Sequence, residues 1–407
     1  MKVLQINNVH YRRGGADAVY LNTAELLQQH GNEVVFFNMV RKGNLPCKDE
    51  KYWVSSLDSR PSGIKSKFIE LRNVFDNPEA SRKIEELIVA EKPDIAHIHL
   101  FWGMGISPSI SSVLRKYHIP LVHTAHDYHL ICPVALLMDS KGQICEACKG
   151  KHFYKAMLKG CSHNGRIITC IKVAEQYYHN LKYNPIDVLQ GIIYVSSFSR
   201  DKHLEYMPSL AKVQSTILYN FNTVGAFDRK ESGDYYLYYG RLSQEKGLFT
   251  LLNGFKQNPS LKLKIVGAGP LEKVLKQVLP DNVDILGPKY GDELFEIVKG
   301  AKFVCVPSEC YENNPMTIVE SFSRGVPVIG SHLGGITEII RDGETGFLFE
   351  HKNVASLCGC LKKAQELNKR DYEEMCAKAY RFALDNFNSD QHYAKLMAFY
   401  NTVLSSK

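Results

Sequence analysis

The chain alternates short apolar runs with longer segments in which apolar residues recur at a helical period. This alternation is typical of parallel sheets covered by helices. In the first half, the predicted strands are Val3–Ile6, Glu33–Phe37, Asp94–His99, Leu121–Thr124 and Gly191–Val195. In the second half, they are Tyr236–Tyr239, Leu263–Val266, Val283–Leu286, Phe303–Val306, Pro327–Gly330 and Gly346–Phe349. The expected fold class is therefore α/β, with two Rossmann-like, doubly wound domains.

The segment Phe221–Asp234 has no apolar period and contains several turn-forming residues, so we interpret it as the inter-domain linker. We expect an N-terminal domain over residues 1–218 and a C-terminal domain over residues 219–387. A last helix at about residues 388–407 is expected to pack back on the first domain. Two such domains bring the carboxyl ends of their strands, and hence their ligand-binding loops, to the two walls of a central cleft.

Composition narrows the class of protein. The 407 residues are 44% hydrophobic and 23% charged, which excludes disordered and collagen-like chains. No run approaches the roughly 18 uncharged apolar residues of a membrane helix, and the first residues are too polar for a signal peptide. We therefore expect a cytoplasmic protein whose eleven cysteines are reduced thiols or metal ligands.

The net charge of +7 is concentrated in one window. Residues 141–172 contain seven basic residues and one acidic residue, a net charge of +6. The remainder is close to neutral, which argues against nucleic acid as a partner. The basic window could instead contact an anionic membrane, or it could be a solvated loop excursion.

Two glycine-containing loops could hold a phosphorylated ligand. Gly14 and Gly15 precede a predicted helix, where backbone N–H groups and the helix dipole favour an anion; the alternative is a flexible turn. The second loop, G-R-L-S-Q-E-K-G, places Arg241 and Lys246 between a strand and a helix. One planar guanidinium and one ammonium suit a diphosphate, although a solvated loop could carry the same residues.

A third motif, P-S-E-C-Y-E-N-N-P-M-T-I-V-E, ends in a predicted helix start. Pro315 is expected as the first helical residue, with Asn314 as its cap. Glu320 then falls in the second turn and Glu312 precedes the helix, so both carboxylates can reach one ligand. A buried carboxylate at Glu320 needs hydroxyl donors, which a ribose diol supplies. The alternative is a pair of surface glutamates.

These three motifs occur in order with G-G-I-T-E-I-I-R-D-G-E-T-G-F-L at residues 334–348. Together they resemble a retaining glycosyltransferase of family 4 with the GT-B fold, over nearly the whole chain. The resemblance implies a nucleotide-diphosphate sugar as donor, bound by the second domain. It implies a saccharide or lipid-linked saccharide as acceptor, on the side of the first domain. Transfer of a hexose in bacterial surface-polysaccharide synthesis would follow, at the inner face of the cell membrane.

The resemblance also assigns roles to residues. Glu320 would hold the ribose and Glu312 the donor sugar. Arg241 and Lys246 would neutralise the diphosphate, and Gly15 would lie against the donor across the cleft. No D-x-D motif occurs in the sequence, so no metal is expected in catalysis.

One departure concerns the donor. Many family members read E-x-F-G-L where this chain reads E-N-N-P-M, and Pro315 has no N–H to donate to a ligand. We expect Asn314, Pro315 and Met316 to line the donor. Either neighbouring amides replace the missing donor or the sugar sits differently, so donor identity stays open.

The run H-T-A-H-D-Y-H follows a strand of the first domain. His126 matches the position of the family's active-site histidine beside the transferred sugar, although a structural histidine is the alternative. Asp127 could orient His126 through a ring nitrogen. His99 ends the preceding strand and is expected on the acceptor side, whereas His123 is expected to be structural.

A fourth feature lies outside the family pattern. Four cysteines give C-x12-C-x2-C-x12-C, namely Cys132, Cys145, Cys148 and Cys161. Such a set could bind a structural zinc ion, or it could be reduced thiols in a loop excursion.

Other functions remain open on the same two-domain fold. An epimerase of sugar nucleotides would need no acceptor, and a phosphorylase would bind free phosphate. A non-catalytic sugar-nucleotide binding protein would release no nucleoside diphosphate. A panel of nucleotide sugars, tested with and without acceptor, separates these alternatives from a transferase.

Overall fold

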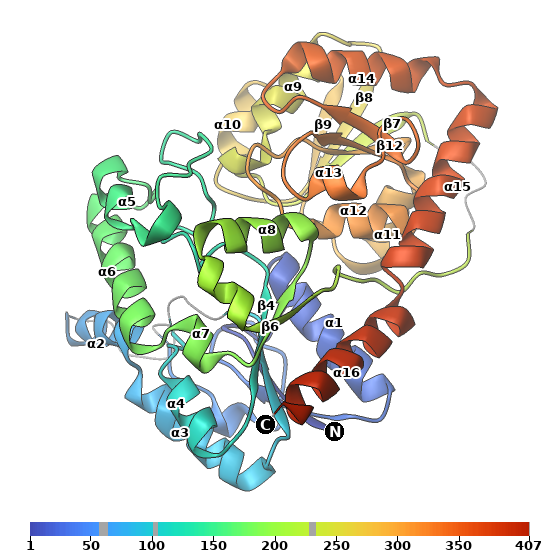
Figure 1. The fold of residues 1–407 in the computed structure, drawn as a ribbon. Coiled ribbons are helices and arrows are strands. Elements are labelled where there is room, and N and C mark those ends of the chain that lie inside the picture. Colours follow the sequence, from blue (N-terminus) through green and yellow to red (C-terminus); the bar gives the residue numbers. More distant parts are fainter. Residues whose placement is uncertain (57–63, 101–104, 228–232, 407) are drawn as a thin grey trace. The chain divides into compact units, whose positions relative to one another are not determined.

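The computed structural model describes residues 1–56, 64–100, 105–227 and 233–406 (Figure 1). The chain forms two compact units. The first contains Met1–Leu218 together with Tyr393–Lys407, and the second contains Tyr219–His392. Residues 228–232 of the predicted linker lie outside the described residues. Within the described ranges, no helix is both long and apolar enough to cross a bilayer.

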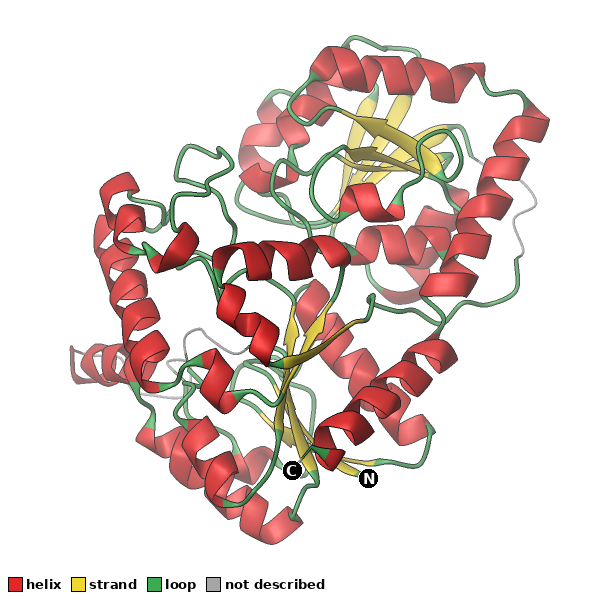
Figure 2. Ribbon diagram, viewed as in Figure 1, coloured by secondary structure: helices red, strands yellow, loops and turns green. Residues whose placement is uncertain are grey.

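The first unit is built on a six-stranded parallel sheet with the order β2-β1-β3-β4-β5-β6. Figure 2 shows the strands of this sheet in yellow, with helices beside them in red. The strands are β1 (Lys2–Ile6), β2 (Glu33–Phe37), β3 (Ile95–Ile98), β4 (Leu121–Ala125), β5 (Gly191–Tyr194) and β6 (Gln214–Ile217). The order reverses between β1 and β3, and a doubly wound sheet binds ligands at the carboxyl ends of strands beside such a reversal.

Helices cover this sheet. They are α1 (Gly15–Gln29), α2 (Ile64–Phe75), α3 (Pro78–Glu91), α4 (Ile110–Lys116), α5 (Tyr154–Lys159), α6 (Arg166–Lys182), α7 (Pro185–Val188) and α8 (Ser197–Tyr206). The last helix, α16 (Ser389–Ser405), returns to this unit and packs with α1 on one face of the sheet (Figure 1). Leu396, Phe399 and Val403 of α16 share a core cluster with Val3 and Val122 of the strands.

The second unit contains another six-stranded parallel sheet, with the order β12-β11-β10-β7-β8-β9. Its strands are β7 (Tyr235–Tyr239), β8 (Lys262–Val266), β9 (Val283–Gly287), β10 (Phe303–Val306), β11 (Val328–Ser331) and β12 (Gly346–Phe349). Its helices are α9 (Leu248–Lys256), α10 (Glu272–Gln277), α11 (Gly291–Gly300), α12 (Met316–Phe322), α13 (Ile336–Ile339), α14 (Val354–Glu366) and α15 (Lys369–Asn386). Here the order reverses between β7 and β10, which marks the expected ligand edge.

The strand predictions are confirmed, each to within one residue at either end. Strands such as β10 are continuous apolar runs because a central strand of a parallel sheet is buried on both faces. Strand β6 was not predicted. Its sequence, Q-S-T-I, is polar at three of four positions, and it lies at the edge of the sheet with its side chains half-buried or exposed. Helix α3 begins at Pro78, and the side chain of Asn77 caps it.

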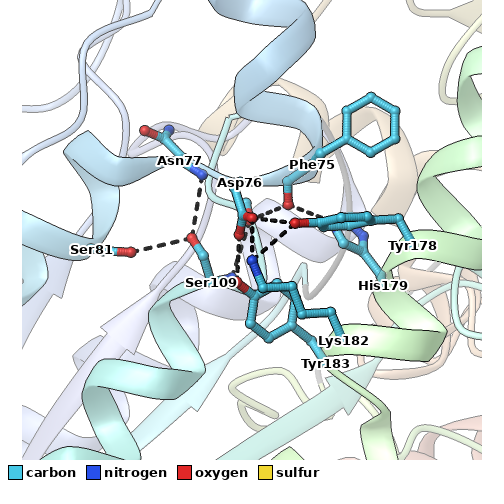
Figure 3. A network of polar contacts seen from close by, with 10 residues as sticks. Phe75, Asp76, Asn77, Ser81, Ser109, Tyr178, His179, Lys182 and Tyr183 are labelled. Atoms are coloured by element: carbon cyan, nitrogen blue, oxygen red, sulfur yellow. Dashed lines mark hydrogen bonds and ion pairs between the residues drawn. The ribbon is translucent and has the colours of Figure 1, made fainter.

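A polar network holds α6 against the joint between α2 and α3 (Figure 3). Asp76 lies in that joint, and its carboxylate accepts hydrogen bonds from the hydroxyls of Tyr178 and Tyr183. The ammonium of Lys182 lies 2.5 Å from the same carboxylate. Burial by itself would raise the pKa of Asp76, but Lys182 and the two phenols outweigh burial and lower that pKa.

Candidate active site

Two loops of the second unit meet at the β7/β10 reversal. Lys246 ends a short 3-10 turn (Gln244–Lys246) between β7 and α9. Its Nζ lies 2.5 Å from Oε1 of Glu312, in the loop after β10, and the hydroxyl of Ser308 donates to the same oxygen at 2.6 Å. The side chains of Lys246 and Glu312 are only 29% and 15% exposed. A cation and a carboxylate predicted separately from two motifs therefore form one ion pair.

The charges of this pair stabilise one another. Burial would raise the pKa of Glu312, but the charge of Lys246 and the hydrogen bonds from Lys246 and Ser308 outweigh it and lower that pKa. Burial would likewise lower the pKa of Lys246, and the charge of Glu312 raises it instead. Both groups are therefore ionised at neutral pH.

Glycines allow the two loops to approach so closely. Gly247 has a φ of +68°, and a Cβ built on it would lie 1.9 Å from the carbonyl oxygen of Pro307. A Cβ on Gly335 would lie 1.8 Å from the carbonyl oxygen of Asn313, and the Gly335 amide donates to the carbonyl of Glu312 at 2.7 Å. Side chains at either position would push the loops apart, so both glycines help to fix Glu312.

Arg241 lies in the same loop as Lys246 but is exposed. Its carbonyl accepts a hydrogen bond from the hydroxyl of Tyr238 at 2.7 Å, which fixes the backbone of the loop. Arg241 thus follows β7 at the carboxyl edge of the sheet, in the loop that leads to the Lys246 turn.

The predicted start of α12 is wrong by one residue. Pro315 is the N-cap, with φ −67° and ψ 125°, and the helix begins at Met316. Asn314 does not cap the helix, because its side-chain oxygen accepts from the backbone amide of Asn220 at 3.0 Å. The side chain of Asn220 also donates to the carbonyl of Asn314, at 2.7 Å. Asn314 therefore ties the motif to the segment that enters the unit.

Glu320 lies in the second turn of α12, as predicted, and is half-buried. Its carboxylate is close to the hydroxyl of Tyr239 at the end of β7. Burial and, after burial, the charge of Glu320 raise the pKa of that phenol. The carbonyl of Glu320 accepts from Arg324 at 2.8 Å. Glu312 and Glu320 thus have different neighbours, Lys246 and Tyr239, at the ends of the same two strands.

In the first unit, His126 follows β4 and His99 follows β3. Nε2 of His126 lies 2.9 Å from Nδ1 of His99, and the two rings are stacked. Nε2 of His99 lies 2.9 Å from the side-chain oxygen of Gln5, on β1. Burial lowers the pKa of His126 to about 4, so this imidazole is neutral at physiological pH.

Asp127 is bonded to His129, whereas the prediction assigned it to orient His126. Its carboxylate accepts from the His129 amide at 2.9 Å and lies 3.2 Å from Nδ1 of the same ring. Burial would raise the pKa of Asp127, but the charge of His129 and the hydrogen bonds from its ring and amide together outweigh burial and lower that pKa. Nδ1 of His123 lies 3.1 Å from the carbonyl of Ile98, and burial lowers the pKa of His123 to about 3, as a structural role requires.

The Gly-Gly loop precedes α1, where Gly14 is the N-cap and Gly15 is the first helical residue. Both glycines are exposed. Asp17, in the first turn, is buried, accepts from the side chain of Asn7 at 2.9 Å and lies 3.5 Å from Nε of Arg13. A carboxylate therefore already occupies the first turn of α1, which the sequence reasoning did not take into account.

The four cysteines are all buried and lie near one another. Their proximity has an electrostatic effect, since the neighbouring thiols contribute to the raised pKa values of Cys148 and Cys161. Burial is the main cause, and it raises both pKa values to about 12. Nζ of Lys159 donates to Sγ of Cys145 at 3.4 Å. Among the described residues, no group of three or more His, Cys, Asp or Glu is arranged to hold a metal ion. This finding goes against the predicted zinc site, and Lys159 contacts one of the four sulfur atoms instead.

Several site residues were missed in the sequence. Ser308 lies inside the quoted motif, but nothing there indicated that its hydroxyl would reach Glu312. Gln5 could have been recognised, because it is a polar residue inside the apolar run of β1, and the structure shows it fully buried.

Two family models match the chain. The model described as Glycosyltransferase Family 4 matches residues 13–220, and the model described as Glycosyl transferases group 1 matches residues 223–382. An uncharacterized glycosyltransferase of Methanocaldococcus jannaschii is 31% identical over 295 residues, 70% of this chain and 69% of its own. An uncharacterized 42.6 kDa protein in the cps region of Klebsiella pneumoniae is 27% identical over 363 residues, 84% of this chain and 88% of its own.

Solved structures show the same fold. Sucrose-phosphate synthase from Thermosynechococcus elongatus superposes with a TM-score of 0.73 at 16% identity, covering 100% of both chains. Anabaena HepE, solved with UDP and glucose, gives a TM-score of 0.68 at 14% identity, covering 99% of this chain and 100% of its own. The two family models match most of the chain, and its two parallel sheets have the fold of these neighbours. The chain therefore belongs to the family 1/4 glycosyltransferases of the GT-B fold.

Proposed function

We propose that this glycosyltransferase moves a hexose from a nucleotide-diphosphate sugar to a saccharide or lipid-linked saccharide, with retention of configuration and without a catalytic metal. The observation that carries the proposal is the Lys246–Glu312 pair. It brings a cation and a carboxylate to the β7/β10 reversal, where a doubly wound sheet binds its ligand.

The second unit would bind the donor. The leaving diphosphate gains negative charge as the glycosidic bond breaks, and Lys246 and the exposed Arg241 can stabilise that charge. Glu320 can accept hydrogen bonds from the ribose hydroxyls, and Glu312 can accept from a hydroxyl of the sugar. Because Lys246 is paired with Glu312 in the free protein, donor binding would let one ammonium serve both a carboxylate and a phosphate.

The first unit would bind the acceptor. His126, at the β4 end, would contact the transferred sugar, and His99 would act through it. Gly14 and Gly15, exposed at the start of α1, would lie against the donor. Retention would follow from attack on the face that the diphosphate leaves, with a phosphate oxygen as the base.

Surface-polysaccharide synthesis is the proposed setting. The Klebsiella relative is named from a cps region, and a Salmonella typhimurium relative, 30% identical over 169 residues, is named a lipopolysaccharide 1,2-N-acetylglucosaminetransferase. This second match covers 37% of the chain and 44% of that protein. Donor and acceptor are therefore to be measured rather than taken from a relative.

The test is a panel of nucleotide sugars assayed for release of nucleoside diphosphate, with and without saccharide acceptors. We expect acceptor-dependent release with one donor, and loss of that release in Lys246→Met. The matched control is Lys262→Met, which removes an exposed, ion-paired lysine at the start of β8. Isomerisation of the donor without acceptor would instead identify an epimerase, and donor binding with no turnover would identify a binding protein.

We further infer that the basic window touches an anionic membrane. Leu158 on α5 and Ile167 on α6 are 76% and 77% exposed, and Tyr154 and Met157 are exposed beside lysines of the same window. Phe153, by contrast, is buried in the unit. A surface lysine near anionic lipid contributes about 1 kcal/mol, and an exposed aliphatic side chain adds to it.

Co-sedimentation with vesicles of anionic and of neutral lipid tests this contact. The parent should bind only anionic vesicles, and less at higher salt. Lys155→Glu combined with Leu158→Asp should abolish binding, whereas Lys369→Glu, at an exposed lysine of the second unit, should not. A parent that ignores anionic vesicles at low salt would refute the membrane contact.

A further inference from the structure

Glu309 joins the loop that carries Glu312 to the turn that carries Lys246. Its backbone amide donates to the carbonyl of Glu245 at 2.8 Å. Its side-chain Oε1 accepts a hydrogen bond from the hydroxyl of Thr250, on α9, also at 2.8 Å. Since Lys246 lies between Glu245 and Thr250 in the chain, Glu309 holds the segment of Lys246 on both sides.

The side chain of Glu309 is closely surrounded. Thr250 is buried, and only 17% of the Glu309 side chain is exposed. A Cβ built on Gly247 would lie 3.2 Å from Cγ of Glu309, so this side chain packs directly against the turn. Nζ of Lys352, after β12, lies 3.9 Å from the second carboxylate oxygen. The carboxylate is therefore held between α9 and the segment that follows β12.

The other side of the Glu312 loop is anchored as well. The carbonyl of Ser308 accepts a hydrogen bond from the hydroxyl of Ser331, on β11, at 2.7 Å. The amide of Gly335 donates to the carbonyl of Glu312, also at 2.7 Å. Because the loop is fixed on this side, the contacts of Glu309 set how far it stands from the 3-10 turn after β7.

The contact between Glu309 and Thr250 has two physical explanations. Thr250 is in the first turn of α9, and the N-cap of this helix, Gly247, has no side chain to cap it. A carboxylate at that end is stabilised by the helix dipole, which requires the charge of Glu309. The hydrogen bond from Thr250 instead requires an acceptor oxygen in the right position, which a neutral side chain of the same shape also supplies.

We propose that Glu309 and Thr250 are positioning residues, which hold the Glu312 loop against the Lys246 turn and so set the spacing at which Lys246 can meet a diphosphate. The proposal deepens the proposed function and rests on it for the presence of the donor. Nζ of Lys246 lies 2.5 Å from Oε1 of Glu312. If the two loops separated, the ammonium would lose either this carboxylate or its place beside the phosphate. Electrostatic stabilisation of a leaving group depends on such preorganisation.

The spacing can be measured through the reactivity of Lys246 with acetic anhydride, followed by mass spectrometry of its peptide. Only an unprotonated amine reacts. Burial would lower the pKa of Lys246, but Glu312 and the other neighbouring groups together outweigh burial and raise that pKa. A looser pair would lower the pKa, and each unit gives about tenfold more free amine. Lys262, which is exposed, provides the internal reference.

Thr250→Val replaces the hydroxyl by a methyl group of similar size and tests the contact. We expect Lys246 to be acetylated about tenfold faster than in the parent, relative to Lys262. Thr250→Ser keeps the hydroxyl and should keep acetylation slow. Thr345→Val is the matched control, because it removes a hydrogen bond from the Arg341 amide at the amino end of β12. Parental acetylation of Lys246 in Thr250→Val would refute the positioning role.

Glu309→Gln separates position from charge. Glutamine keeps an oxygen that accepts from Thr250 but has no charge for the helix dipole, so we expect Lys246 to stay slowly acetylated. Equally fast acetylation in Glu309→Gln and Thr250→Val would overturn the proposal in favour of a purely electrostatic contact. If Thr250→Val does not fold, as judged by circular dichroism, Glu309→Ala removes the same hydrogen bond and should give the fast rate. An unchanged rate in a folded Glu309→Ala variant would also count against the proposal.

Kinetics connect the spacing to the reaction. With a donor that turns over, Thr250→Val should lower kcat/KM about tenfold, mainly through kcat, because preorganised contacts act most strongly in the transition state. Thr345→Val should match the parent. A parental kcat in Thr250→Val, despite fast acetylation, would refute the link to catalysis. Acetylation needs no substrate, so if no nucleotide sugar turns over, the proposed function fails while the acetylation rates still decide the positioning role.

Discussion

Replacing Lys246 with methionine tests the ion pair at the β7/β10 reversal. Methionine keeps most of the length of the side chain but leaves the Glu312 carboxylate with the Ser308 hydroxyl as its nearest hydrogen-bond donor. Removing one partner of a fully buried pair costs about 3–5 kcal/mol, and a fully exposed pair is worth less than about 1 kcal/mol. The side chains here are 29% and 15% exposed, so we expect a loss of about 2 kcal/mol in the stability of the second unit.

The pH dependence of this loss has a definite sign. The folded pKa of Glu312 lies below its ordinary value of 4.5, so the contribution of the pair is complete above that value. It disappears as the pH falls through the folded pKa. The difference between parent and Lys246→Met should therefore shrink on acidification, and Glu312→Gln should recover part of the stability lost in Lys246→Met.

The assay must report on the second unit. Both tryptophans, Trp53 and Trp102, belong to the sequence of the first unit, so tryptophan fluorescence reports on the wrong part of the chain. Hydrogen exchange of the amides in β7 and β10 reports on the right part. With a nucleotide sugar that turns over, Lys246→Met should also lower kcat/KM by about 2–4 kcal/mol of transition-state stabilisation. Additive effects of Lys246→Met and Glu312→Gln on exchange would refute the pair.

Three further outcomes are expected. Glu320→Ala should weaken binding of the nucleoside diphosphate, measured by calorimetry, more than it lowers kcat. The reason is that a ribose contact contributes equally to the ground state and the transition state. Unchanged affinity would exclude the ribose role of Glu320. Asp76→Asn should lower the free energy of unfolding of the first unit by about 2 kcal/mol, measured by urea denaturation with tryptophan fluorescence as the signal. The difference between parent and variant should vanish as the pH falls through the lowered pKa of Asp76. Cys148 should react with iodoacetamide about a thousandfold more slowly than a free cysteine in solution, because burial raises its pKa from an ordinary 9 to about 12. Acceleration by a chelator would contradict this account in favour of a bound metal.

The sequence predicted central strands such as β10 well because they are uninterrupted apolar runs buried on both faces. It missed β6, where an edge position tolerates polar side chains. Motifs within one loop were also readable: Lys246 and Glu312 each stood in a recognisable local pattern. Their direct contact was not readable, because it depends on two loops that are 66 residues apart in the chain.

The errors share this cause. Asn314 has the residue type of a helix cap, but Asn220, 94 residues away, takes its side-chain oxygen. Asp127 is next to His126 in sequence, yet the ring of His126 is bound by His99, which lies on another strand. Local pattern gives the propensity of a residue for a partner, and tertiary structure decides which partner it meets.

The return of α16 to the first unit has a consequence for biosynthesis. The second unit, Tyr219–His392, is complete before the last residues are translated, so it can fold while the first unit still lacks Leu396, Phe399 and Val403 from its core. The hydrophobic core of the first unit can therefore be completed only after residues 393–407 have been synthesised. Truncation after residue 392 would leave the second unit intact and remove the Tyr400 hydroxyl that lies 2.6 Å from Nδ1 of His97, so the loss of α16 would be felt inside the sheet of the first unit.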